Sequence, residues 1–343
     1  QCCLTDKARM AAMNRTIALH AALVICLSIA AAASLCIGSV TLSLTDVFRE
    51  LSGEEGHLGH LILYEIRLPR TLLALLVGAT LGMAGAALQG FLRNPLAEPG
   101  LLGVGNGAAL GAVIAIYSGI TLTVPFSLPI YAMMGAMLAV VLVYVLSGQS
   151  SASQTLILAG IAVSSLFASC VAVALNLAPN PFAAMEVVFW LMGSLSNRTM
   201  EQVGLVAPFI LCGWLIMLSC SQALDALSLG RNTASSLGIS LRSVQWRLAA
   251  GVALSVGAGV AVTGSIGFIG LVVPHIMRPF VGSRPGALLP VSALGGAILL
   301  LLADIAVRLI PTAGMELRVG VITALVGAPF FLLLLFHHKR RMA

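Results

Sequence analysis

Side chains that could do catalytic chemistry are few and scattered in this sequence of 343 residues. Its only lysines, Lys7 and Lys339, lie near the ends of the chain, so no glycine-rich loop can finish in the Lys-Ser/Thr pair that holds nucleotide phosphates. The acids within or beside apolar runs are Glu98 and Asp304, far apart in sequence. No nucleophile elbow or His-x-x-Glu-His motif is present. We therefore expect a chain that is not an enzyme.

Metal ligation is not predicted either. The seven cysteines show no ligand spacing, and five of them lie in or beside apolar runs, where cysteine behaves as a small hydrophobic residue. His57 and His60 have a spacing that would suit two ligands on a helix, but two histidines in a polar loop are more simply solvated side chains. We expect no metal site and no cofactor in this chain.

Arginine is the residue type whose placement suggests binding. Arg67 and Arg70 are spaced i, i+3, which puts both side chains on one face of a helix start. Arg308 ends one long apolar run, and Arg318 begins the next. One interpretation is that these side chains extend to the membrane surface from helix ends. The other is a positive ring that binds acidic residues of a partner protein.

Apolar residues dominate the rest of the chain: 59% of residues are hydrophobic, 9% are charged, and the mean hydropathy is +1.05. This composition excludes a soluble protein and leaves no basic soluble domain for nucleic acid. About 20 apolar residues in a helix cross a bilayer. Ten runs qualify: 17–37, 71–92, 101–120, 128–146, 156–177, 203–220, 244–262, 266–281, 288–310 and 319–336. The first is interpreted as a retained helix rather than a signal peptide, and Met10 and Met13 are candidate native initiators.

Positive charge predicts the orientation. Ten spans put both termini on one side of the membrane, and 12 of the 18 Lys and Arg residues fall on that side. Because cytoplasmic loops have an excess of Lys and Arg, both termini are predicted to be cytoplasmic. The net charge of +6 is therefore a topology signal.

The chain also repeats itself in order: residues 78–81 recur as 251–254, 129–136 as 290–297, and 158–166 resemble 318–326. The second unit begins five spans after the first, and an odd number of spans inverts its direction in the membrane. We therefore predict an all-α integral membrane protein with about ten transmembrane helices in two inverted repeats. The predicted parts are a first helix (14–37), repeat one (67–177), linking helices (178–222), a polar segment (223–240) and repeat two (243–336), all within one transmembrane domain over 1–343.

The polar segment lies on the predicted cytoplasmic side. Its periodicity predicts two short amphipathic helices that meet at a break at Gly230 and stop at Gly238. A third amphipathic helix is expected outside the membrane, within residues 179–195, where Phe189 and Trp190 suit either a protein contact or interfacial anchoring. Taken alone, the polar segment would also suit an ordinary helix on the membrane surface.

Segments 67–107 and 248–279 closely resemble the permease subunits of bacterial ABC importers for iron-siderophores, haem and vitamin B12. The resemblance runs from about Thr45 to Phe336. It implies a partner ATPase that binds ATP and Mg²⁺, a second permease copy or paralogue, and a periplasmic binding protein that delivers a metal-chelate cargo. The family wording ALxLGxxxAxxLGI is kept at residues 226–239. The resemblance thus implies ATPase coupling by Ala223, Leu224, Asp225, Ala226, Leu227, Ser228, Leu229, Gly230, Arg231, Ala234, Leu237 and Gly238.

The same resemblance assigns the remaining sites. It implies binding-protein docking by Arg67, Arg70 and Arg308. Arg318 departs from the family wording Glu-Leu-Pro-x-Gly, and it would either tune docking or favour an anionic cargo. It implies inner gates at four positions: Asn94, Leu96, Ser153 and Gln154. The fifth span also has polar groups that could line the pathway, Ser164 and Ser165. The alternative for the serines is a hydrogen bond to their own helix backbone.

We therefore expect the membrane-spanning subunit of an ATP-driven importer in the bacterial inner membrane. Iron-siderophore is the first expectation for the cargo, with haem and cobalamin as alternatives. An ion-coupled secondary transporter is a more distant alternative, because it would need charged residues at mid-membrane, and the spans contain almost none.

Overall fold

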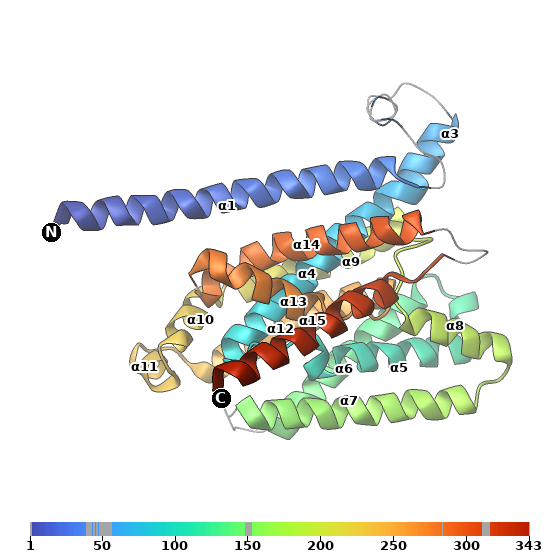
Figure 1. The fold of residues 1–343 in the computed structure, drawn as a ribbon. Coiled ribbons are helices and arrows are strands. Elements are labelled where there is room, and N and C mark those ends of the chain that lie inside the picture. Colours follow the sequence, from blue (N-terminus) through green and yellow to red (C-terminus); the bar gives the residue numbers. More distant parts are fainter. Residues whose placement is uncertain are drawn as a thin grey trace.

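Long apolar helices, laid side by side, form the body of the molecule in the computed structural model (Figure 1). The structure describes residues 2–38, 43, 45, 47, 57–147, 153–282, 284–310 and 316–342. Within these residues the elements are helical, and no strand occurs. The predicted all-α membrane fold is confirmed.

The longer helices are α1 (Cys2–Cys36), α4 (Leu68–Leu92), α5 (Val104–Tyr117), α6 (Ser127–Ser147), α7 (Ser153–Asn176), α9 (Met200–Leu218), α12 (Leu241–Thr263), α14 (Pro285–Leu309) and α15 (Val319–Met342). The shorter ones are α3 (His57–His60), the π-helical η1 (Leu61–Arg67), η2 (Pro99–Leu102), η3 (Ile120–Leu122), α8 (Pro181–Leu191), α10 (Ser221–Ser228), α11 (Arg231–Ser236), α13 (Ile269–Met277) and η4 (Arg278–Val281).

Each of the ten predicted spans corresponds to one main helix or, for 266–281, to α13 and η4. The span 101–120 consists mainly of α5, with the end of η2 and the start of η3 on either side. Seven helices in the described part of the chain are long and apolar enough to cross a membrane, while α5, α13 and the described apolar part of α15 are shorter. The length of α13 has a local cause. It begins only after a non-helical segment in which Phe268 has φ +67°, and it contains Pro274. A proline inside a helix removes a backbone donor, so short, broken helices are expected here.

Helices α4 and α12, the first of each predicted repeat, run in opposite directions. The end of α4 lies beside α10, because Gly90 packs near Leu224, and α10 precedes the start of α12. The start of α4 lies at the other end of the bundle, where Arg70 meets Asp304 near the end of α14. Figure 1 shows this antiparallel course, with both marked chain ends on the side of α10 and α11.

The helix packing also follows the repeat. Helix α4 packs against α14, and its counterpart α12 packs against α6, the counterpart of α14. In the same way, α5 packs on α6 and α7, while α13 packs on α14 and α15. The two units are therefore interlocked, each giving its first helix to the other. The residue boundaries predicted for the repeats stay a prediction.

Glycines bring the interlocked helices close. A Cβ atom on Gly78 of α4 would lie 2.5 Å from the Gly296 carbonyl oxygen, and one on Gly296 would lie 2.2 Å from the Gly78 oxygen. Both distances are far inside van der Waals contact, so the two backbones touch where they cross. This is the packing mode of small residues in membrane helices, where close approach replaces the hydrophobic driving force.

Candidate functional site

Helices α10 and α11 form the predicted pair of short helices. They meet at Gly230, whose φ of +119° suits glycine, and a second positive φ at Gly238 follows α11. Helix α10 is fixed to the bundle by Leu224 and Leu227, which are fully buried. In contrast, Leu229 is 69% exposed and Leu237 is 63% exposed. The segment therefore has one face built into the protein and apolar side chains on the other.

Other residues of the polar segment also attach it to the bundle. Ala234 is buried, Ala223 and Ala226 pack against the core, and Arg231 begins α11. Ser228 donates from Oγ to the Asp225 carbonyl oxygen at 2.6 Å. The Asp225 carboxylate accepts a 2.7 Å hydrogen bond from the Gly286 backbone N–H, in the first turn of α14. A carboxylate at a helix N-terminus satisfies an unpaired N–H and faces the positive end of the dipole.

At the opposite end of the bundle, Arg67 and Arg308 cap the C-terminus of α1 with hydrogen bonds to its last carbonyl oxygens. Arg67 donates from Nη1 to the carbonyl oxygens of Leu35 and Cys36, the latter at 2.8 Å. Arg308 donates from Nη1 to the Ser34 oxygen at 2.7 Å and the Ile37 oxygen at 3.0 Å. The last carbonyls of a helix have no partner within the helix, and cations are favoured there. These two arginines thus tie α1 to α4 and α14.

Arg70 joins the two repeats by ion pairs. Its Nε lies 2.9 Å from Asp304 Oδ1, and its two terminal nitrogens lie 3.1 and 2.9 Å from the carboxylate oxygens of Glu316. Asp304 also accepts from Arg308. Asp304 is fully buried, and the side chain of Arg70 is 10% exposed. A buried charge needs such pairing, and the fork-like geometry of Arg–Glu is the strong form of it.

Burial of Arg67, Arg70 and Arg308 bears on the docking prediction. All three guanidinium groups already have partners within the chain, so a carboxylate of another protein would have to compete with Asp304, Glu316 or the α1 carbonyls. The docking role of these arginines stays a prediction. Their internal partners were not predicted from the sequence, although the i, i+4 spacing of Asp304 and Arg308 was a usable signal.

Arg318 has a different environment. It lies just before α15 with its guanidinium carbon 5.2 Å from the centre of the Phe189 ring of α8. Arg198, in the segment between α8 and α9, lies near it and donates to the Ser194 carbonyl oxygen at 3.5 Å. Burial, together with the charge of Arg318, lowers the pKa of Arg198 to about 10. Two like charges therefore lie close together at the α8 end of the bundle, where Glu186 of α8 also lines a surface pocket with Arg318.

The predicted gate residues lie at the α10 end. Asn94 Oδ1 accepts from the Leu96 backbone N–H at 3.0 Å, which fixes the turn after α4. Both residues are half-buried, while Gln154, in the first turn of α7, is exposed. Ser153 is the first residue of α7. The gating role of these four residues stays a prediction.

The serines of α7 have mixed surroundings. Ser164 accepts a 2.6 Å hydrogen bond at Oγ from Asn106 of α5, and its carbonyl oxygen accepts from the same amide at 3.2 Å. Ser165 lies exposed on the next face, and its carbonyl oxygen accepts from Ser169 Oγ within the helix. The link to Asn106 was not predicted, because nothing in the spacing of the two residues indicates that α5 and α7 pack.

Glu98 lines a cavity of about 130 Å³ where the two repeats meet. Its carboxylate accepts a hydrogen bond from the Phe268 backbone N–H, next to the start of α13. Ser265 and Gly105 also line this cavity. The break before η2 and the break before α13 therefore contact each other, as expected for paired broken helices in inverted repeats.

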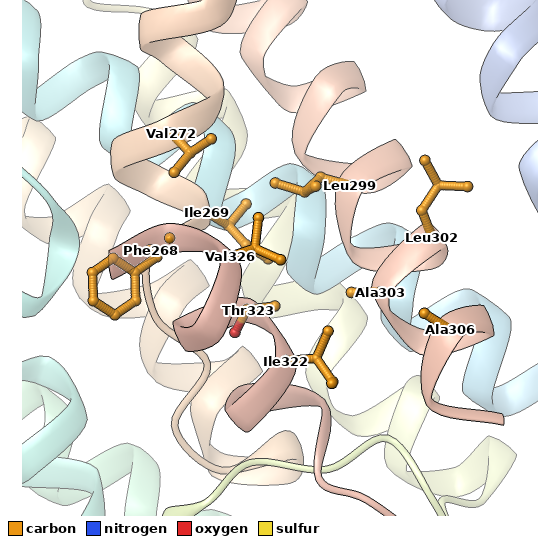
Figure 2. A pocket seen from close by; sticks show the side chains of 11 residues that line it. Phe268, Ile269, Val272, Leu299, Leu302, Ala303, Ala306, Ile322, Thr323 and Val326 are labelled. Carbon is orange, nitrogen blue, oxygen red and sulfur yellow. The ribbon is translucent and has the colours of Figure 1, made fainter. Parts of the chain in front are cut away.

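A second cavity, of about 220 Å³, opens between α13, α14 and α15 and is almost wholly apolar (Figure 2). Figure 2 shows Ile269 and Val272 of α13 facing Leu299 of α14 and Val326 of α15. Thr323 is the polar side chain among the lining residues, and its hydroxyl donates to the Gly320 carbonyl oxygen at 3.0 Å. Such a surface suits hydrocarbon rather than a charged cargo.

Comparisons with known proteins agree with this architecture. The model of the FecCD transport family matches residues 25–337. The chain is 42% identical to the Fe(3+) dicitrate transport system permease protein FecD of Escherichia coli, over 82% of this chain and 87% of that protein. It is 41% identical to the vitamin B12 import system permease protein BtuC of Vibrio cholerae, over 80% and 82%. An uncharacterized ABC transporter permease, YvrB of Bacillus subtilis, is 40% identical over 81% and 80%.

A solved structure of a metal-chelate type ABC transporter in an inward-facing conformation superimposes with a TM-score of 0.82, at 33% identity, over 94% of this chain and 99% of that one. The fold and the relatives define a multi-pass membrane permease of a type II ABC importer, a transport subunit rather than an enzyme. The chain belongs to the FecCD transport family. Such permeases work with ATPase and membrane-protein partners.

Proposed function

We propose that this chain, paired with a second copy or a paralogue, forms the membrane pathway of an importer in the bacterial inner membrane. Two ATPase subunits, which bind ATP and Mg²⁺, drive it from the cytoplasm, where both chain termini lie. A periplasmic binding protein delivers the cargo. Alternating access follows from a rearrangement of the interlocked helices, driven through α10 and α11.

The surface of α10 and α11 is the observation that supports this coupling role. Asp225 joins α10 to the first turn of α14, and Leu224 fixes α10 beside the end of α4. A force on α10 would therefore reach both repeats at once. Leu229 and Leu237 are exposed, and a large apolar side chain left in water favours burial against a partner. We infer that the ATPase covers them.

The cargo that we propose is a ferric siderophore, with haem and cobalamin as the alternatives. The two positive side chains at the outer mouth, Arg198 and Arg318, suit an anionic chelate better than a neutral one. Relatives named for ferric dicitrate and for vitamin B12 have similar identity to this chain, so identity does not separate the alternatives. Uptake in cells that lack their own permease, with each labelled cargo in turn, would separate them.

Co-purification tests the coupling role. We expect Leu229→Glu with Leu237→Glu, or Gly230→Pro, to abolish binding of the ATPase, because the first pair removes the apolar contact and proline cannot adopt a φ of +119°. The matched control is Met200→Glu, which also replaces an exposed apolar residue but lies at the opposite end of the bundle. Normal ATPase binding by variants that remain monodisperse would contradict the proposal.

A further inference from the structure

A polar pocket lies at the α10 end of the bundle, between the turn of the predicted gate residue Asn94 and Ser228 of α10. It has a volume of about 330 Å³, and Gln89, Arg93, Asn94, Ser228 and Arg278 provide its polar lining. These residues come from the end of α4, the turn that follows it, α10 and the start of η4. The volume is within the range of pockets that bind small molecules.

Arg278 is held in place within this pocket. Its Nη2 donates to Gln89 Oε1 at 2.7 Å, and Gln89 Nε2 donates to the Gly270 carbonyl oxygen at 3.2 Å. Gln89 is buried, so this amide has a fixed orientation. A guanidinium has five N–H donors. In the described part of the chain, Arg278 has no other side-chain hydrogen bond and no carboxylate within ion-pair distance.

Arg93 and Asn94 are turned into the same pocket by the backbone. Arg93 has φ +51° and ψ +36°, a left-handed conformation that is uncommon outside glycine, and it ends α4. The oxygen of the Asn94 side chain is used by the Leu96 N–H, which leaves its NH₂ group as a donor. The Asn94 amide and the Arg93 guanidinium have no hydrogen-bond acceptor among the described side chains.

Among the described residues, no Asp or Glu lines the pocket to balance these positive groups. The nearby carboxylate of α10, Asp225, is directed to the Gly286 backbone N–H instead. Two guanidinium groups and an amide NH₂ therefore face a concave space that no described carboxylate lines. Arginine pairs with phosphate oxygens through parallel N–H donors, and basic pockets between membrane helices bind lipid phosphates.

We propose that this pocket binds a phosphate group, held by Arg93, Arg278 and the Asn94 amide. The phosphate belongs either to the headgroup of an anionic phospholipid or to a free phosphate. Binding itself does not depend on the proposed function. If α10 couples to an ATPase, the bound phosphate would also join Ser228 of that helix to the Asn94 turn.

Native mass spectrometry and thermal unfolding of the full chain in detergent test the proposal. The probes are dioleoyl phosphatidylglycerol and inorganic phosphate, with sodium chloride at matched ionic strength. We expect Arg93→Gln with Arg278→Gln to weaken binding of the effective probe at least tenfold. The control is Arg242→Gln with Arg247→Gln, because it removes the same charge from two exposed arginines of α12 that do not line the pocket.

Each outcome has a distinct meaning. Site-dependent binding of the phospholipid identifies the headgroup, and site-dependent binding of inorganic phosphate alone identifies the free ion. Equal loss in both double variants, or no binding of either probe, overturns the proposal. If the double variant does not fold, Arg93→Gln alone replaces it, because the exposed Arg93 side chain has no partner to lose in the described structure. The ATPase co-purification experiment is independent of all these outcomes, so failure of one proposal is distinguishable from failure of the other.

Discussion

The Asp225 carboxylate accepts a 2.7 Å hydrogen bond from the backbone N–H of Gly286. Gly286 has no room for a side chain at this point, because a Cβ atom would lie 2.6 Å from the Ser221 carbonyl oxygen. Helix α10 and the first turn of α14 are therefore in direct backbone contact. Any movement of α10 has to be transmitted to α14 or has to break this bond.

The first prediction concerns this bond. We expect Asp225→Ala to lower transport at least tenfold while the ATPase still binds, because α10 keeps Leu224 and Leu227 buried but loses its link to α14. Asp225→Asn keeps an oxygen acceptor and should retain most activity. Transport and ATP hydrolysis would be measured together in proteoliposomes. Unchanged transport by the alanine variant would show that the bond has no part in coupling.

A second prediction concerns the buried carboxylate Asp304. Asp304→Ala leaves Arg70 and Arg308 buried without this partner, and breaking a buried ion pair costs about 3–5 kcal/mol. We expect a large drop in the thermal unfolding midpoint in detergent. Glu201→Ala, which removes an exposed acid from the start of α9, should change the midpoint little. A similar small change in both variants would mean that the network adds no stability.

The Arg70–Glu316 ion pair and the Asp225–Gly286 hydrogen bond show the limit of what the sequence could predict. The spans, the two short helices with their break at Gly230, and the opposite directions of the two units followed from hydropathy, glycine and the repeat. The Arg70–Glu316 pair did not, because 246 positions separate the two residues and only the packed fold brings them together. The contact of Asp225 with Gly286 was equally hidden, since a backbone N–H has no signature in the sequence. Residues 39–42, 44, 46 and 48–56, most of the acidic segment between α1 and α3, lie outside the described residues.

A third prediction follows from the position of Arg318. It is half-exposed and has no carboxylate partner in the described structure, whereas Arg67 and Arg70 are buried. We expect Arg318→Glu to weaken docking of the periplasmic binding protein or entry of an anionic cargo. Docking loss should shrink at high salt, because exposed charges are screened there. Separate measurements of binding-protein affinity and of cargo uptake identify which step changes. No change in either quantity would contradict both roles for Arg318.

A fourth prediction concerns acid stability through Glu316. Burial opposes ionisation of this carboxyl, but hydrogen bonds from Arg70 and Ser196 outweigh it and hold the pKa below the usual value. A lowered pKa in the folded state means that the stabilisation is present above the unfolded pKa of about 4.3, and that it is lost as the pH falls through the folded value. We expect the unfolding midpoint to fall below about pH 4.3, with a weaker fall in Glu316→Gln. Parallel curves for both proteins would exclude Glu316 as the cause.

The last prediction concerns the crossing of α4 and α14 at Gly78 and Gly296. Alanine at Gly296 would put its Cβ atom 2.2 Å from the Gly78 carbonyl oxygen, and the neighbouring backbones cannot yield as a flexible side chain would. The helices must separate, and overpacking of this kind costs about 1–3 kcal/mol. Gly204 of α9 offers the matched control, because a Cβ atom there meets nothing within 4 Å. Gly204→Ala should keep or slightly raise stability, since alanine is the better helix former. Equal unfolding midpoints for the two variants would show that the close crossing does not hold the repeats together. A lower midpoint for Gly296→Ala alone would show that the interlocked repeats depend on backbone contact at this point.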